Sequence, residues 1–335
     1  MKKAYKKYIA EGKPPIYIAI ICSVIIRLKF YYGASAQSLQ SINGSYLWNL
    51  LEPYLHGSIL LSSILNFIFA IGIALFVSHL NTRYSIIRKR TNLPFSITLI
   101  LLSSSAQLIT MSPHCIGIFF VLLAIDKLFS CYQQSNSSAR IAFDFGFYFA
   151  LGSLFSQDVL IYIPFFLIGL SFMRSFSFKA IFTSLLGTIF VYWLVLFYFL
   201  SKDNLEVFYA PFLHWAEIDI YNYFPFSDYN YIDFGALLFS IIIISIVVFS
   251  NYADNYKDKI RVRANISFIN MIMIFSMAAY LFIPFKPVVC LMIAITTASV
   301  VISHFFALAD KRWQVYLFYI SLLSLLSYYF FIFSI

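Results

Sequence analysis

Long runs of apolar residues, separated by short polar segments, repeat along the whole chain. A helix that crosses a hydrocarbon core about 30 Å thick needs about 20 apolar residues, because it rises about 1.5 Å per residue. Segments of about that length are 15–32, 56–78, 94–111, 178–200, 234–250, 266–284, 288–307 and 315–335. Shorter or interrupted segments are 113–129, 141–155 and 159–172. The pattern predicts an all-α, polytopic transmembrane helix bundle of about 11 spans, forming one domain over 1–335.

Composition supports this class of protein. The chain is 61% hydrophobic and 11% charged, with a mean hydropathy of +0.85, whereas soluble domains are about 25% charged. A soluble core of this size has no room for so much apolar surface, so the excess must face lipid. The net charge of +9 is dispersed over short loops, so we expect no nucleic-acid partner. The four cysteines have no CxxC spacing, and we expect neither a metal nor a cofactor.

The distribution of Lys and Arg predicts the orientation. With the N-terminus in the cytoplasm, most basic residues fall on the inner side, and the outer segments hold only Lys202 and Lys286. We therefore predict an inner N-terminus, an outer C-terminus and a cytoplasmic basic tail over 1–14. The first apolar run is expected to stay in the protein, because no small-residue cleavage site follows it.

Two outer segments are longer than turns. Segment 33–54 starts with small polar residues and continues as the amphipathic stretch YLWNLLEPYL. Segment 201–233 is acidic and rich in aromatic residues, which is typical of a helix lying in the membrane interface. The inner loops are too short to fold as domains, so chemistry or recognition is expected on the outer side or within the membrane.

Arg27 and Lys29 lie at the far end of the first apolar run. One interpretation is that both side chains extend to the outer headgroups. The other is that they bind a phosphate in the outer leaflet. Two positions apart on a helix, they differ by about 200° around its axis, so they do not share a face. Arg27 is the better phosphate ligand, since a planar guanidinium makes paired hydrogen bonds to phosphate.

Other polar residues also allow two interpretations. Glu52 and His56, at i, i+4 spacing, are either a helix-start acid beside an interfacial histidine or a general base with its partner. Asp144 either pairs with Arg140 at the inner membrane face or ties neighbouring helices together. His214 and Glu217 have an i, i+3 spacing that allows metal binding, but a third ligand would have to come from elsewhere and the whole segment is acidic, so we predict no metal site.

Four stretches carry a resemblance to known families: HLNTRYSIIRKRTNLP, LITMSPHCIGIFFVLLAIDKLF, FDFGFYFALGSLF and IPFFLIGLSFMRSFSFKAIFTSLLGTIFVYWL, within 79–195. Together they resemble a polytopic inner-membrane family of Bacteroidota that has no assigned reaction. More distantly, the chain is similar to C-type membrane glycosyltransferases, which use polyprenyl-phosphate sugars. That resemblance implies a catalytic acid in the first outer loop, where Glu52 is the only acid.

Three hypotheses follow for a multi-pass protein of the bacterial inner membrane and cell envelope, and whether it is an enzyme stays open. The first is a glycosyltransferase-like protein that binds a polyprenyl-phosphate lipid at the outer leaflet through Arg27, with Lys29 and His56 nearby and Glu52 as base. The second is a non-catalytic subunit or scaffold with membrane-protein partners. The third is a solute or lipid transporter, for which LLSSSAQLIT is the one polar stretch within a span.

Overall fold

The computed structural model describes residues 5–33, 44–55, 58–104, 106–134, 138–216, 231–254, 256, 258–283 and 287–332. Within these ranges the chain is 83% helical and contains no strand. The all-α prediction is therefore confirmed, and every predicted apolar segment overlaps at least one helix.

The helices differ in length. The long ones are α2 (Pro14–Gly33), α4 (Ile59–Tyr84), α6 (Pro113–Ser130), α9 (Phe178–Leu200), α11 (Tyr231–Ala253), α12 (Ile260–Phe282), α13 (Val288–Ala307) and α14 (Arg312–Ile332). The shorter ones are α3 (Trp48–Leu55), α5 (Leu93–Leu101), α7 (Ser138–Ser153), α8 (Ile163–Phe172) and α10 (Leu205–Ala216). Short π or 3₁₀ turns are η1 (Lys6–Ala10), η3 (Ala106–Leu108) and η4 (Gln157–Tyr162).

Seven helices of the described part are long and apolar enough to cross a membrane: α2, α4, α6, α9, α11, α12 and α13. This is the architecture of a multi-pass membrane protein. Helices α5, α7 and α8 are shorter, at 9, 16 and 10 residues. The total of about 11 spans and the orientation of the termini stay predictions.

Serine side chains define several helix ends. Ser58 Oγ accepts a hydrogen bond from Leu61 N at the start of α4, and Ser177 Oγ accepts one from Ala180 N at the start of α9. Such caps satisfy N–H groups that have no partner within the helix. Helix α4 ends at Tyr84, and the next residue, Ser85, adopts the left-handed conformation with a φ of 49°.

Helix α5 is the main departure from the predicted spans. Segment 94–111 was expected to be one helix, but α5 ends at Leu101 and the chain continues through η3 before α6 begins. Ser103 Oγ donates a hydrogen bond to the Leu99 carbonyl at 2.9 Å. Serine side chains compete in this way with the backbone bonds of a helix, and the run of serines after Leu102 ends α5 early.

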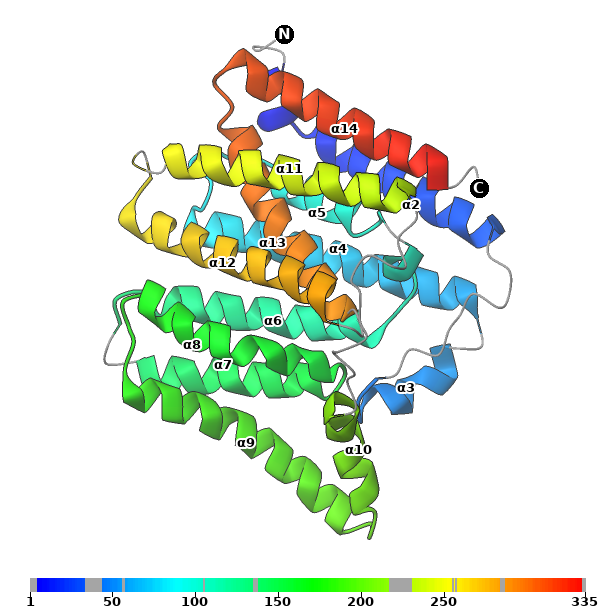
Figure 1. The fold of residues 1–335 in the computed structure, drawn as a ribbon, viewed down its shortest axis with the longest axis vertical. Helices are drawn as coiled ribbons and strands as arrows, with labels where there is room; N and C mark the ends of the chain where they lie inside the picture. Colours follow the sequence, from blue (N-terminus) through cyan, green and yellow to red (C-terminus); the bar gives the residue numbers. More distant parts are fainter. Residues whose placement is uncertain are drawn as a thin grey trace.

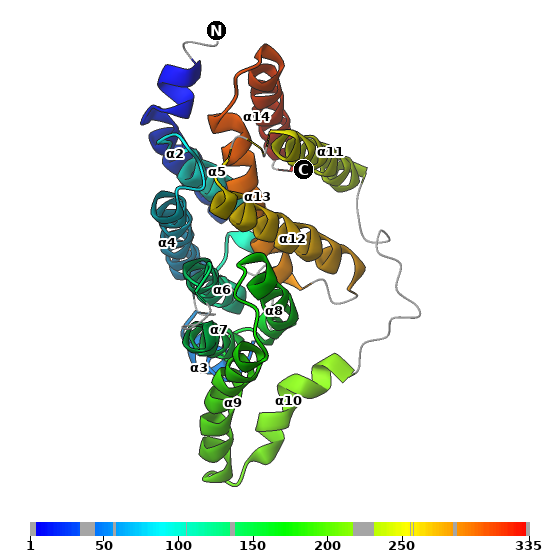
Figure 2. The ribbon, with the colours of Figure 1, turned by 90° about the vertical axis from the view of Figure 1, so that its left-hand side faces the viewer.

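Most of the helices lie side by side along a common direction, whereas α10 and α13 run steeply across it (Figure 1). Seen from the side, α2, α4, α6, α7 and α9 follow one another in one row, while α14, α11, α13, α12 and α8 form a second row (Figure 2). Helix α13 is the most enclosed of the seven apolar helices, because 72% of its apolar 18-residue stretch is buried. The short helix α5 packs against α2, α4 and α13, so its end lies among other helices.

Helices α7 and α9 pack with their backbones in close approach. A Cβ added to Gly146 would collide with the Ser184 carbonyl, and one added to Gly187 would collide with the Phe143 carbonyl. Thr188 Oγ1 donates a hydrogen bond to the Gly146 carbonyl at 3.3 Å. Small residues at such positions let membrane helices approach and gain van der Waals contact.

Candidate functional site

Arg27 lies on α2 with its guanidinium turned into the bundle, and only 6% of the residue is exposed. Its Nη1 donates hydrogen bonds to Ser23 Oγ and Ser103 Oγ, both at 2.6 Å, and its Nη2 donates to Asn66 Oδ1 at 2.9 Å. The guanidinium carbon lies 5.0 Å from the centre of the Phe67 ring. We call Ser23, Arg27, Asn66 and Ser103 the Arg27 cluster. Because Arg27 points inward, the expectation that it extends to the outer headgroups is wrong.

The Arg27 cluster lies at the carboxyl end of α5. Ser103 Oγ is 2.8 Å from Ser23 Oγ, and the Ser103 backbone N–H donates to the Ile100 carbonyl at 3.0 Å. The last carbonyl groups of a helix carry partial negative charge, so a nearby cation is favourable. The guanidinium of Arg27 therefore stabilises a helix that stops within the bundle.

Side chains of α4 supply hydrogen-bond partners to the irregular backbone between α5 and α6. Asn66 Nδ2 donates a hydrogen bond to the Thr110 carbonyl at 2.9 Å, and Ser62 Oγ accepts one from Met111 N at 2.9 Å. Asn66 Nδ2 also lies 3.2 Å from Cys115 Sγ on α6. Non-helical backbone at membrane depth is tolerated only where the protein supplies such partners. The polar contacts of the Arg27 cluster thus extend from α2 to α6.

The other predicted site residues lie elsewhere. Lys29 is exposed on α2, and Glu52 is half-buried on α3. His56 lies outside the described residues, so its pairing with Glu52 stays a prediction. Figures 1 and 2 both place α4 between α2 and α3. Arg27 and Glu52 are therefore on helices separated by α4.

The chain before α3 is fixed to two other elements. Ser45 N donates a hydrogen bond to the Phe155 carbonyl at 2.9 Å, at the end of α7. The next residue, Tyr46, donates its hydroxyl to the Phe208 carbonyl of α10 at 2.5 Å. Burial, followed by the neighbouring Tyr192, raises the pKa of the Tyr46 hydroxyl, which keeps it a donor. The two segments predicted to lie outside the membrane thus contact each other.

Asp144 pairs with a different base from the one predicted. Its Oδ2 lies 2.8 Å from Lys127 Nζ, which comes from α6, while Arg140 is exposed. The two paired side chains are each about one-third exposed, at 34% and 32%. The close packing of α6 and α7 brings Lys127 to Asp144. The acid consequently ties two neighbouring helices, as the second interpretation expected, but near the surface.

A second acid was missed by the sequence analysis. Both carboxylate oxygens of Asp126 on α6 accept hydrogen bonds from Arg83 Nη1, at 2.8 and 2.6 Å. The Tyr84 hydroxyl donates to the Asp126 carboxylate at 3.0 Å and lies 2.7 Å from its backbone carbonyl. Asp126 lies within an apolar run, and that position was the available signal for a buried acid.

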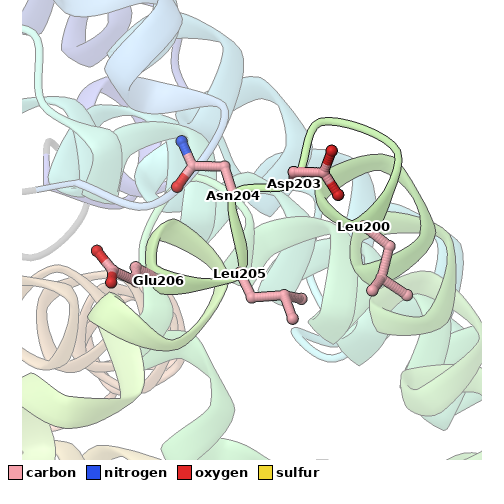
Figure 3. Close-up of a pocket in the computed structure, with 5 residues that line it drawn as sticks. All are labelled: Leu200, Asp203, Asn204, Leu205 and Glu206. Carbon is pink, nitrogen blue, oxygen red and sulfur yellow. The ribbon is translucent and has the colours of Figure 1, made fainter.

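An open hollow of about 450 Å³ lies at the turn between α9 and α10 (Figure 3). Its lining consists of Leu200, Asp203, Asn204, Leu205 and Glu206. Figure 3 shows these side chains pointing in different directions instead of converging on one point. A binding site brings its polar groups together, so this hollow is a surface depression at the start of the acidic segment 201–233.

Within the described residues, no group of three His, Cys, Asp or Glu side chains is placed to hold a metal ion. The side chain of His214 and the whole of Glu217 lie outside those residues. No family model, curated protein or solved structure matches the chain. The resemblance to the Bacteroidota family and to C-type glycosyltransferases therefore stays a prediction.

Proposed function

We propose that this multi-pass membrane protein binds the phosphate of a polyprenyl-phosphate lipid, with Arg27 as the phosphate ligand, and acts as a glycosyltransferase-like protein of the bacterial inner membrane. The observation that carries the proposal is the Arg27 guanidinium, which is buried and hydrogen-bonded to two hydroxyls and an amide oxygen. An ionisable group within membrane helices points by default to a functional site.

A bound phosphate would replace the neutral hydrogen-bond acceptors of the Arg27 guanidinium with charged oxygen atoms. Hydrogen bonds between a guanidinium and phosphate are charge-assisted, and they are about twice as strong as those between neutral groups. Ser23 and Ser103 would lose the hydrogen bonds that they accept from Arg27, and the Ser103 hydroxyl would have to leave the Leu99 carbonyl to donate to the same phosphate. In this proposal the exposed Lys29 guides the anionic headgroup toward α2.

The transferase part of the proposal rests on the sequence resemblance and on Glu52. As a half-buried carboxylate on α3, Glu52 would act as the base toward an acceptor, with His56 as its partner. Because α4 separates α2 from α3, the lipid would have to extend from its phosphate at Arg27 to the acceptor at Glu52.

The test is mass spectrometry of the lipids that the gently purified protein retains. We expect stoichiometric polyprenyl phosphate in the wild type and its loss in Asn66→Asp. That variant keeps the size of the side chain and places a competing carboxylate 2.9 Å from the guanidinium, while it also removes the amide donor to the Thr110 carbonyl. Arg140→Ala, which removes an exposed arginine, is the matched control. Bulk phospholipid alone, unchanged in Asn66→Asp, would contradict the proposal.

Transport is the second candidate, because α5 is interrupted where the Arg27 cluster lies. Discontinuous helices supply substrate and ion sites in many transporters. The assay is uptake of inorganic phosphate into liposomes that contain the purified protein. Uptake that is lost in Asn66→Asp, without retained polyprenyl phosphate, would favour transport over lipid binding. Retained lipid without uptake would favour the first candidate.

A further inference from the structure

A histidine and a serine outside the Arg27 cluster are hydrogen-bonded to each other at the start of α6. His114 lies in the first turn of α6 and is 7% exposed, and Ser156, which directly precedes η4, is 2% exposed. His114 Nδ1 lies 2.8 Å from Ser156 Oγ. A histidine that activates a serine nucleophile lies about 2.6–3.2 Å from its hydroxyl, so this pair has the geometry of a base and a nucleophile.

The local structure of both elements brings the two side chains together. Ser156 is the N-cap residue of η4, yet its side chain makes no capping hydrogen bond, and its hydroxyl lies against the imidazole instead. Gly117 follows His114 by one turn on α6. A Cβ added to Gly117 would lie 2.9 Å from a Val159 methyl carbon and 3.4 Å from Ser156 Cβ. Glycine at this position therefore lets η4 approach the start of α6 closely.

The residue after the serine supplies a buried amide. Gln157 is 8% exposed, and within the described residues neither its Nε2 nor its Oε1 makes a hydrogen bond. Leaving both ends of a buried amide unpaired costs stability. An amide N–H beside a nucleophilic serine is, however, the kind of donor that stabilises the negatively charged oxygen formed during acyl transfer.

We propose that Ser156, His114 and Gln157 form an acyl-transfer site, separate from the Arg27 cluster, whose substrate is the carboxylic ester of a lipid. The walls beside the serine are apolar, because methyl groups of Val159 and Val289 border the Cβ position of Gly117. An apolar wall with a few polar groups suits a fatty acyl ester, and the surrounding membrane contains such esters.

The site lies directly beneath the surface of the protein. Phe155 and Asp158, which flank Ser156 and Gln157 in the sequence, are both partly exposed. An ester has to displace only this outer layer to reach the serine hydroxyl. The burial of the reacting groups then keeps most water away from the reaction.

The proposed reaction has two halves. Ser156 Oγ attacks the carbonyl carbon of the ester, and its proton passes to His114 Nδ1, while the other ring nitrogen keeps its own proton. Gln157 Nε2 donates a hydrogen bond to the carbonyl oxygen as that atom gains negative charge. The bond between the carbonyl carbon and the alcohol oxygen breaks, and the leaving alcohol takes the proton from His114. A second alcohol, or water, then attacks the acyl-serine in the same way and restores the Ser156 hydroxyl.

Reaction with an alkyl fluorophosphonate tests the site, because an activated serine displaces the fluoride of this reagent and keeps the phosphonate. The purified protein is incubated with a fluorophosphonate that carries a dodecyl chain, and the labelled peptide is identified by mass spectrometry. We expect the label on Ser156, and we expect it to be absent from protein that was first unfolded. In His114→Gln, which lacks the base, the labelling rate should fall at least about 100-fold.

Gln157→Leu separates catalysis from structure. It removes the donor for the charged oxygen, so the labelling rate should fall about 100-fold. Its free energy of unfolding should not fall, because the unpaired amide is replaced by an apolar side chain of similar size. Ser153→Ala is the matched control, since Ser153 is a buried serine of α7 whose Oγ lies 2.7 Å from the Tyr192 hydroxyl. It should keep the wild-type labelling rate.

Three results would overturn the proposal. The first is folded wild-type protein that leaves Ser156 unlabelled, and the second is labelling of His114→Gln at the wild-type rate. The third is an equal rate for a methyl and a dodecyl fluorophosphonate, which would exclude a lipid substrate. Should His114→Gln fail to fold, the labelled position in the wild type and the rate in Gln157→Leu still decide.

Discussion

The backbone contact between α7 and α9 makes Gly187→Ala a demanding test of the fold. The new methyl group would collide with the Phe143 carbonyl oxygen and lie 3.0 Å from Phe147 N. Both are backbone atoms of α7, so a side-chain rotation does not relieve the contact. The two helices would have to move apart, and the van der Waals contacts around Gly146 would be lost with them.

The size of the effect follows from two opposing terms. Overpacking in a close-packed interior costs about 1–3 kcal/mol, while replacing glycine by alanine inside a helix gains up to about 1 kcal/mol. Gly72→Ala on α4 is the matched control, because an added Cβ there meets no atom within 4 Å. Since both variants gain the helix term, their difference isolates the steric cost. We expect Gly187→Ala to be less stable than Gly72→Ala by about 2 kcal/mol.

The assay is reversible unfolding of the purified protein in mixed micelles with increasing dodecyl sulfate, followed by helical circular dichroism. The free energies of unfolding of Gly187→Ala, Gly72→Ala and the wild type are compared under one condition. Equal stability of the two variants would refute the close packing of α7 on α9. A loss of stability in Gly72→Ala alone would refute the open space beside α4.

Two further predictions concern buried acids. Asp126→Asn removes the negative charge that faces Arg83, and we expect the free energy of unfolding to fall by about 1–2 kcal/mol in the same assay. This value is smaller than for a fully buried pair, because the Arg83 side chain is 49% exposed. A free energy of unfolding equal to that of the wild type would contradict this prediction. Burial raises the pKa of Asp258, just before α12, but His304 and two nearby arginine side chains lower it to a net value below the ordinary one. The lowered pKa of Asp258 means that its ionised form stabilises the fold above about pH 4 and that this contribution is lost as acidification passes the lowered value. In thermal melts at decreasing pH, the melting temperature of the wild type should therefore fall more than that of Asp258→Asn. Melting temperatures that fall in parallel for the two proteins would contradict this prediction.

The positions of the helices could be predicted from the sequence, because apolar length is a local property. Segments 178–200 and 288–307 coincide with α9 and α13 to the residue. The exception is 94–111, where a run of serines ended α5 at Leu101. Apolar length alone does not reveal this, since the polar contacts that stabilise the early end come from α2 and α4.

The candidate site was only partly predictable for the same reason. Arg27 was identifiable from its position in an apolar run, but its partners Asn66 and Ser103 are 39 and 76 residues away. Asp144 seemed to have a base one turn away, at Arg140, yet packing supplied Lys127 from another helix. A side chain in a membrane bundle can pair with residues of several helices, whereas sequence spacing describes only the neighbours on its own helix.

The acids of the described residues divide between the two ends of the bundle, and this division limits the chemistry. Acids that pair with a basic side chain from another segment include Asp126, Asp144, Asp258 and Asp310. They lie at the end where α4 and α6 finish and where α2, α7, α12 and α14 begin, which is the predicted inner side. Their charges are engaged in holding helices together. The acids at the opposite end are Glu52, Asp158 in η4 and those that begin at Asp203. Asp158 was not singled out by the sequence, and any transferase hypothesis has to include it beside Glu52.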